Sequence, residues 1–119
     1  MKKTDYNLAV YCGARSGNDP LFTERAQELG TLCAQNNIGV VYGGGRTGLM
    51  GTVAGATLDA GGVVYGVVTH KLVGLEGVYP GQTTLDIVDT MHQRKIAMIE
   101  KADAFVAMPG GPGTLEEFF

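Results

Sequence analysis

The chain has 119 residues, which is enough for one domain with a single hydrophobic core. Its nine lysines and arginines against twelve aspartates and glutamates give a formal charge of −3, which argues against a generic basic surface for nucleic acid or anionic lipid. The N-terminal segment MKKTDYNLAVYC has too short an apolar run for a signal peptide or a membrane span, so we expect a cytoplasmic protein with no membrane partner.

The first part of the chain alternates apolar runs with a helical pattern. Leu8–Tyr11 is a short apolar run that predicts a buried strand. Asp19 and Pro20 then fit the N-cap and the first position of a helix that we expect to end near Gln35. Ile38–Tyr42 (IGVVY) predicts a second buried strand, and the glycine-rich segment GGGRTG follows it directly.

The remainder of the chain continues this alternation. A helix of small residues is predicted over Leu49–Ala60, and the strands expected after it are Val63–Val68, Thr84–Val88 and Ala104–Ala107. A helix over Met91–Lys101 separates the last two of these strands. Thr90 and Gln93 have the spacing of a capping box at the start of that helix.

Continuous apolar strands that alternate with helices are typical of a parallel sheet covered on both faces. The predicted fold class is therefore α/β, a doubly wound parallel sheet in a Rossmann-like three-layer sandwich. In such sheets ligands bind beyond the carboxyl ends of the strands, where loops lead into the next helices. We expect the functional residues at that edge.

Nineteen glycines are concentrated where apolar runs end. The segments CGARSG, GGGRTG and PGGPGT follow three different predicted strands, so a parallel sheet would bring them to one edge. Main-chain N–H groups in such loops, together with the positive end of a helix dipole, suit a phosphate group. The expected phosphate cradle consists of Gly43, Gly44, Gly45, Arg46, Gly110, Gly111, Gly113 and Thr114. The simpler alternative is that these segments are only the tight turns of an α/β protein.

Neither a dinucleotide nor ATP is favoured as the phosphate ligand. GGGRTG fits the pattern G-x-G-x-x-G, but this match alone is weak. About 20 residues further on, VVYGVV has no acidic side chain that could bind a ribose hydroxyl group. The chain also lacks the GK[ST] of a Walker A loop.

The two cysteines, Cys12 and Cys33, have neither CxxC spacing nor a matching pair of histidines. This spacing indicates neither a zinc site nor a disulfide framework. We expect both side chains to be structural, since free cysteine commonly behaves as a small buried apolar residue.

Four stretches carry a resemblance to a known family: YCGARSG, VYGGGRTGLMG, MHQRK and PGGPGTLEE. From Tyr6 onward the sequence resembles the Lonely Guy family of cytokinin riboside 5′-monophosphate phosphoribohydrolases, which has long been mislabelled as lysine decarboxylase-like. The resemblance implies hydrolysis of the N-glycosidic bond of an AMP-like nucleoside 5′-monophosphate to free base and ribose 5-phosphate. It also implies a homodimer and a reaction without metal or organic cofactor.

The resemblance implies roles for particular residues. Glu117 matches the signature glutamate and is the candidate that stabilises an oxocarbenium ion or activates water, while Arg94 matches the essential arginine. Arg94 would lie in the first turn of its helix, where the dipole disfavours a cation unless an anion faces it. The further candidates for substrate binding are Glu76, Met91, Lys95 and Glu116, besides the glycines and Thr114 named above.

Each candidate has a simpler structural alternative. Glu117 lies three residues after Thr114, so the two fit a capping box, and this role is compatible with catalysis. Without the resemblance, Arg94 and Lys95 would be interpreted as basic side chains exposed to solvent at the end of a helix. We expect Met91, Met98 and Ile99 to be core residues, with Met91 also a candidate contact for the base.

The sequence argues against lysine decarboxylation and leaves a carrier function as an alternative. Lysine decarboxylation is rejected because it needs a pyridoxal phosphate lysine and an acidic partner for the pyridinium nitrogen, and the sequence offers no such arrangement. The remaining alternative is a non-catalytic nucleotide or molybdenum-cofactor carrier of the same fold. The presence of MHQRK together with Glu117 favours the enzyme.

The last six residues, from Thr114 to Phe119, read as a helix that has only begun. Leu115, Phe118 and Phe119 have the spacing of one apolar face, yet the segment is shorter than two helical turns. We therefore expect residues 1–119 to form one nucleotide-monophosphate-binding domain that lacks its C-terminal strand and helices. The preferred base and its prenyl substituent cannot be read from the motifs.

Overall fold

A computed structural model describes residues 4, 6–11, 20–44, 48–71, 73 and 81–107. Its strands form one parallel sheet in the order β4-β3-β2-β1-β5. The strands are β1 (Tyr6–Tyr11), β2 (Ile38–Tyr42), β3 (Val64–Thr69), β4 (Thr84–Val88) and β5 (Ala104–Ala107), and the helices are α1 (Pro20–Gln35), α2 (Gly48–Asp59) and α4 (Met91–Lys101). This arrangement confirms the predicted doubly wound α/β fold.

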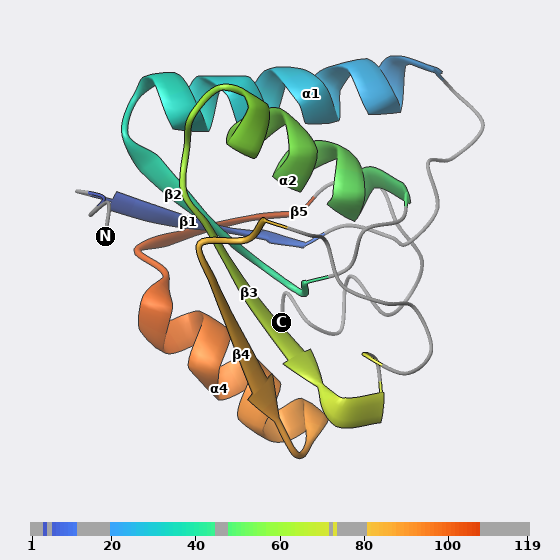
Figure 1. The fold of residues 1–119 in the computed structure, drawn as a ribbon, viewed down its shortest axis with the longest axis vertical. Helices are drawn as coiled ribbons and strands as arrows, with labels where there is room; N and C mark the ends of the chain where they lie inside the picture. Colours follow the sequence, from blue (N-terminus) through green and yellow to red (C-terminus); the bar gives the residue numbers. More distant parts are fainter. Residues whose placement is uncertain are drawn as a thin grey trace.

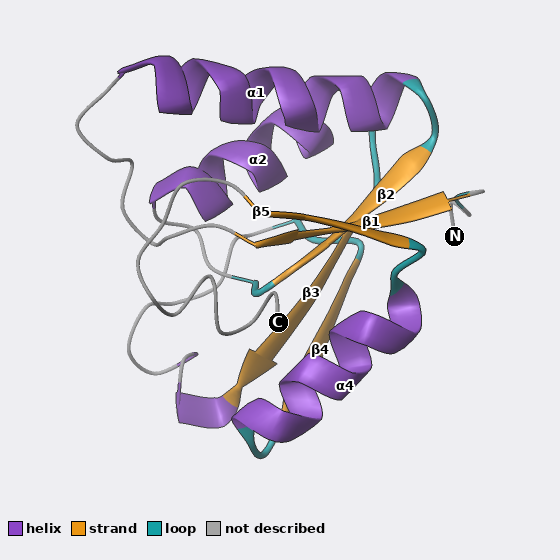
Figure 2. Cartoon of the chain, turned by 180° about the vertical axis from the view of Figure 1, so that it is seen from behind, coloured by secondary structure: helices purple, strands orange, loops and turns teal. Residues whose placement is uncertain are grey.

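The helices cover both faces of the sheet. α1 and α2 lie side by side on one face, and α4 lies on the other (Figures 1 and 2). The strand order explains this division, because crossover connections between parallel strands are right-handed. The chain steps from β1 through β2 and β3 to β4 in one direction and then returns through α4 past β1 to β5, so this last crossover helix covers the opposite face.

The core is split by the sheet into two apolar layers. On the α1 and α2 side, the fully buried residues are Val10, Ala26, Cys33, Val40, Tyr42, Leu49, Val53, Ala54 and Val64. On the α4 side they are Ala9, Tyr11, Val41, Val67 and Met98. Successive residues of a strand point to opposite faces, which is why Val40 and Val41 belong to different layers.

α1 and α2 approach each other closely at Gly30. A β-carbon built on Gly30 would lie 2.5 Å from the Val53 carbonyl oxygen and 2.9 Å from the Thr57 hydroxyl oxygen. The Thr57 hydroxyl group in turn donates a 2.8 Å hydrogen bond to that same carbonyl, inside the core. The absence of a side chain at Gly30 therefore sets the distance between the two helices.

β1 begins at Tyr6, earlier than the apolar run at Leu8 predicts. Tyr6 pairs with Ile38, and the polar Asn7 is accommodated because its groups bond to the chain that leads into β5. The Asn7 amide N–H donates to the Asp103 carboxylate at 2.8 Å, the Asp103 N–H donates to the Asn7 carbonyl at 2.8 Å, and the Asn7 Nδ2 donates to the Lys101 carbonyl at 3.0 Å. β1 and β5 are thus joined by side-chain as well as ladder hydrogen bonds.

Cys33 is a buried core residue, as predicted, and is 2% exposed. Burial in this apolar layer raises the pKa of the Cys33 thiol, because the charged thiolate loses hydration there. Cys12 lies outside the described residues. The cysteine at position 33 therefore serves packing in this fold.

Candidate active site

The ends of β2, β1 and β5 lie next to one another in the sheet. Tyr11 at the end of β1 is level with Ala107 at the end of β5, and the three glycine-rich segments follow these three strands. The strand order reverses between β1 and β5, and such a switch point is where open α/β sheets bind ligands. The predicted meeting of the strands at one edge is confirmed, and the positions of the loops themselves stay a prediction.

Many of the predicted site residues lie outside the described part of the chain. These are Gly45, Arg46, Glu76, Gly110, Gly111, Gly113, Thr114, Glu116 and Glu117. The described candidates are Gly44, after β2, and Met91, Arg94 and Lys95, in α4. The geometry of the site is therefore built from α4 and the ends of β2 and β3.

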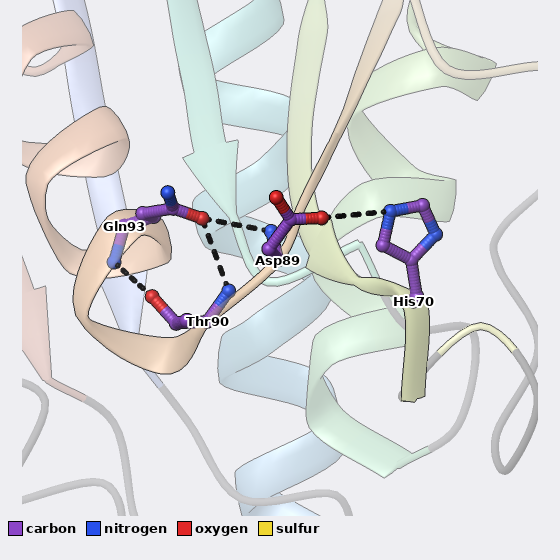
Figure 3. Close-up of polar contacts among 4 residues, drawn as sticks. All are labelled: His70, Asp89, Thr90 and Gln93. Atoms are coloured by element: carbon purple, nitrogen blue, oxygen red, sulfur yellow. Dashed lines mark hydrogen bonds and ion pairs between the residues drawn. The ribbon is translucent and has the colours of Figure 1, made fainter.

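α4 begins with the predicted capping box. The Thr90 hydroxyl group accepts a 3.1 Å hydrogen bond from the Gln93 N–H, and the Gln93 Oε1 accepts from the N–H groups of Thr90 and Asp89 at 3.1 and 2.9 Å (Figure 3). The main-chain N–H groups of Asp89, Thr90 and Gln93 at the helix start are thereby satisfied. The box fixes the position of the first turn, which carries Arg94.

Replacing Thr90 with alanine is expected to lower the free energy of unfolding by about 1 kcal/mol, because the Gln93 N–H loses its acceptor. Urea unfolding followed by circular dichroism measures this loss. Thr90→Ser keeps the hydroxyl group and should retain most of the stability. An alanine variant as stable as the unchanged protein would contradict this view of the cap.

Arg94 is buried, with 6% of its surface exposed. Its Nε donates a 2.9 Å hydrogen bond to the Val67 carbonyl of β3, and its guanidinium group lies against Gly43, directly after β2. The guanidinium group therefore lies between α4 and the sheet, beside the carboxyl end of β2 and next to Val67 of β3. The alternative of a solvated basic helix end is wrong for Arg94, because the helix face that packs on the sheet carries this side chain.

The neighbours of Arg94 in α4 correct two further expectations. Met98 is buried as predicted, but Met91 is 46% and Ile99 54% exposed, so neither is a core residue. Met91 is the first residue of the helix and follows the exposed residues Asp89 and Thr90. Its exposure leaves it accessible to a ligand, which is consistent with its second predicted role as a contact for the base.

Gly44 is held in place on two sides. Its φ angle is +82°, a conformation that favours glycine, and its backbone packs directly on the Val68 side chain. The Gln82 side-chain amide donates a 3.2 Å hydrogen bond to the Gly44 carbonyl. No sequence motif indicates Gln82, which reaches Gly44 from the segment before β4.

A histidine and an aspartate meet at the same end of the sheet. His70 follows β3, and its Nε2 lies 3.2 Å from the Asp89 carboxylate, between the end of β4 and the start of α4 (Figure 3). Both side chains are more than two-thirds exposed, so the pair contributes little to stability. No local sequence pattern links His70 with Asp89, because the two residues lie in different segments of the chain.

The described part of the chain offers neither a cluster of metal-ligating side chains nor a membrane-spanning helix. Within these ranges, no three His, Cys, Asp or Glu side chains gather in a way that could hold a metal ion. None of the helices in the same ranges has the length and apolarity needed to cross a membrane.

The chemistry open to this edge follows from the buried guanidinium group of Arg94. A buried cation is costly unless an anion or several acceptors compensate its lost hydration. Guanidinium groups bind carboxylate and phosphate oxygens through their planar fork of N–H donors. The Arg94 guanidinium group beside the end of β2 can therefore bind an anion, which a ligand or the chain itself could supply.

Several known proteins are similar to this chain in sequence. A family model described as "Possible lysine decarboxylase" matches residues 50–119. The cytokinin riboside 5′-monophosphate phosphoribohydrolase of Rhodococcoides fascians is 44% identical over 119 residues, covering 99% of this chain and 60% of that protein. The cytokinin riboside 5′-monophosphate phosphoribohydrolase LOG1 of Arabidopsis thaliana is 44% identical over 112 residues, covering 92% of this chain and 52% of that protein.

A solved structure shares the fold at lower identity. The molybdenum cofactor binding protein from the phototrophic bacterium Rippkaea orientalis superimposes with a TM-score of 0.79 at 23% identity, over 99% of this chain and 69% of that one. The chain spans 52% to 60% of the length of the two curated relatives named above.

Proposed function

We propose, because the chain belongs to the Lonely Guy family, that it hydrolyses the N-glycosidic bond of a nucleoside 5′-monophosphate. The products are the free base and ribose 5-phosphate. The names of the two relatives give the class of reaction and of substrate. The observation that carries the proposal to this chain is the buried Arg94 guanidinium group beside the carboxyl end of β2.

The reaction exchanges one bond at the anomeric carbon for another. The bond from C1′ to the base nitrogen breaks, its electron pair leaves with the base, and a water oxygen bonds to C1′. One proton of that water goes to the base and the other remains on the new hydroxyl group. Positive charge develops on the ribose ring between these events, so a carboxylate beside the sugar lowers the barrier. No atom is oxidised or reduced in this hydrolysis, so the reaction requires no oxidant or reductant.

The proposed roles follow from this charge distribution. Glu117 stabilises the ribose cation or activates the water, and Arg94 binds an anion, either the substrate phosphate or a carboxylate that must be oriented. Lys95, which is partly exposed, and Met91, which is exposed, contact the nucleotide from the start of α4. Glu76 and Glu116 are retained as further contacts for the substrate.

The phosphate is proposed to bind at the switch point of the sheet. Main-chain N–H groups of Gly44 and Gly45, and of Gly110, Gly111 and Gly113, face it together with Arg46 and the Thr114 hydroxyl group. The neighbouring positions of β2, β1 and β5 support this arrangement, because adjacent strands lie only about 4.8 Å apart. We also propose a cytoplasmic homodimer, and the bound base as an adenine that carries or lacks an isoprenyl group.

An assay of base release tests the proposal. The protein is incubated with AMP or isopentenyladenosine monophosphate, and base and ribose 5-phosphate are quantified by chromatography. We expect both products in equal amounts. Adenosine, which lacks the phosphate, should react with a kcat/KM at least about 100-fold lower, because the binding energy of the phosphate lowers the barrier at C1′.

The same assay separates the enzyme from a carrier. A carrier of the same fold would bind the monophosphate in calorimetry and release no base over many hours. That outcome would replace the hydrolase proposal with the second candidate, which the fold shared with the Rippkaea orientalis protein makes reasonable.

A further inference from the structure

Gly43 and Arg94 occupy neighbouring space at the end of β2. A β-carbon built on Gly43 would overlap the Arg94 Nη2 and lie 3.0 Å from its Cζ and 3.7 Å from its Nε. All three nearest atoms belong to the same guanidinium group. The space that any side chain at position 43 would fill is therefore the space that the guanidinium group fills.

The conformation of Gly43 does not itself require glycine. The described glycines with a positive φ are Gly44, Gly61 and Gly81, and Gly43 is not among them. An L-residue could adopt this backbone without strain. The space needed by the Arg94 guanidinium group thus favours glycine at position 43, and Arg94 reaches it from a helix about 50 residues further along the chain.

The backbone around Gly43 cannot yield easily to an added methyl group. Gly44 is held next to it by the Gln82 amide and by direct packing on Val68. The guanidinium group, by contrast, is the far end of a flexible side chain, fixed here by the hydrogen bond from its Nε to the Val67 carbonyl. A methyl group at position 43 would therefore displace the guanidinium group and leave the strand in place.

We propose that Gly43 is a positioning residue that holds the Arg94 guanidinium group at the carboxyl edge of the sheet. Its missing side chain defines a slot between β2 and α4, and the slot fixes where the five N–H donors point. The catalytic consequence of this inference rests on the proposed hydrolase function. The structural part does not, because it concerns only the contact between these two residues.

The structural part is tested by NMR on the Arg94 side chain. Its Nε–H is buried and hydrogen-bonded, so we expect a resolved signal that exchanges slowly with water. In Gly43→Ala this signal should shift and exchange at least about tenfold faster, because the bond to Val67 is lost. An unchanged signal in a folded Gly43→Ala variant would overturn the proposal.

Gly61→Ala is the matched control. Gly61 has a φ of +80° and open space around it, so alanine strains the backbone and touches nothing within 4 Å. This variant should lose about 5 °C in Tm while the Arg94 signal stays in place. Loss of the Arg94 signal in both variants would mean that general destabilisation is responsible, which would also overturn the proposal.

A thermal double-mutant cycle gives a second, independent readout. In the Arg94→Ala background the slot is empty, so adding Gly43→Ala should change Tm by less than about 1 °C. In the unchanged background the same substitution should lower Tm by several degrees. Equal shifts in the two backgrounds would show that position 43 does not act through Arg94.

Kinetics then tests the catalytic consequence. If the unchanged protein releases base, Gly43→Ala should reduce kcat about 100-fold, since a displacement of about 1 Å is that costly to a preorganised site. Full kcat together with a displaced Arg94 signal would remove the catalytic part of the inference. If the unchanged protein releases no base, the proposed function fails, while the NMR experiment and the thermal cycle still decide whether Gly43 positions Arg94.

Discussion

Replacing Arg94 with alanine is expected to reduce kcat/KM for base release at least about 1000-fold, or about 4 kcal/mol of transition-state stabilisation. The guanidinium group lies where water is largely excluded, so its charge interacts more strongly than a surface charge would. Its fork of N–H donors is also fixed in direction by the bond to Val67. Both effects disappear together when the side chain is removed.

Several variants separate this charge effect from simple loss of structure. Arg94→Lys keeps a positive charge without the planar fork and should lose activity to an intermediate degree. Lys101→Ala removes the same charge from the far end of the same helix, where Lys101 pairs with Asp86 at 3.2 Å, and should keep nearly full activity. Full activity in a folded Arg94→Ala variant would contradict the proposed role.

Glu117 gives a second check on the same mechanism. Glu117→Gln should lose base release to a similar degree, because the amide cannot stabilise a cation as the carboxylate does. If the two residues act as one unit, the combination with Arg94→Ala should be little worse than either single change. Additive losses would instead assign them to separate steps.

Replacing Gly30 with valine is expected to lower the free energy of unfolding by about 3 kcal/mol. The added carbons would meet a main-chain oxygen of α2, at Val53, and the Thr57 hydroxyl group, so the two helices must separate. A loss of this size is a large part of the total stability of a small domain. Urea unfolding at constant m-value would measure it as a fall in midpoint.

Gly30→Ala distinguishes a close helix contact from an ordinary helix position, because the two cases predict opposite changes in stability. In an exposed helix, alanine in place of glycine adds about 1 kcal/mol of stability. At this contact the methyl group would lie 2.5 Å from the Val53 carbonyl oxygen, so the variant should be destabilised instead. Gln27→Ala, at an exposed position of the same helix, should stay within about 0.5 kcal/mol of the unchanged protein. A stabilised Gly30→Ala would refute the close approach of α1 and α2.

The sequence predicted the exact first or last residues of those helices and strands that have clear local signals. α1 begins at Pro20, α4 begins after the Thr90 cap, and β2, β4 and β5 have the expected bounds. β1 was predicted too short because the polar Asn7 interrupts its apolar pattern, and the partners of Asn7 lie in a distant segment. α2 begins and ends one residue earlier than predicted, at Gly48 and Asp59, and β3 begins and ends one residue later, at Val64 and Thr69. Local patterns therefore predicted where most elements lie, and the prediction for β1 was wrong where a tertiary contact overrides its pattern.

The sequence motifs indicated which residues belong to the candidate site, but they did not indicate how the side chains of these residues are buried and what they contact. The motif indicated Arg94, but periodicity could not show that its side chain packs on the sheet while Ile99, one position beyond the buried Met98, points outward. One residue along a helix is a rotation of about 100°, so a small error in the assumed helix face changes burial. The contacts of Gly43 and Gln82 depend on the strand order, which no local pattern encodes.

The pairing of β1 with β5 has a consequence for biosynthesis. Asn7 and Asp103 are 96 positions apart, yet they bond to each other across neighbouring strands. The ribosome thus delivers the middle of the sheet first and its flank last. β1, β2 and β3 can assemble early, but β5 can pair fully with β1 only after Ala107 has emerged.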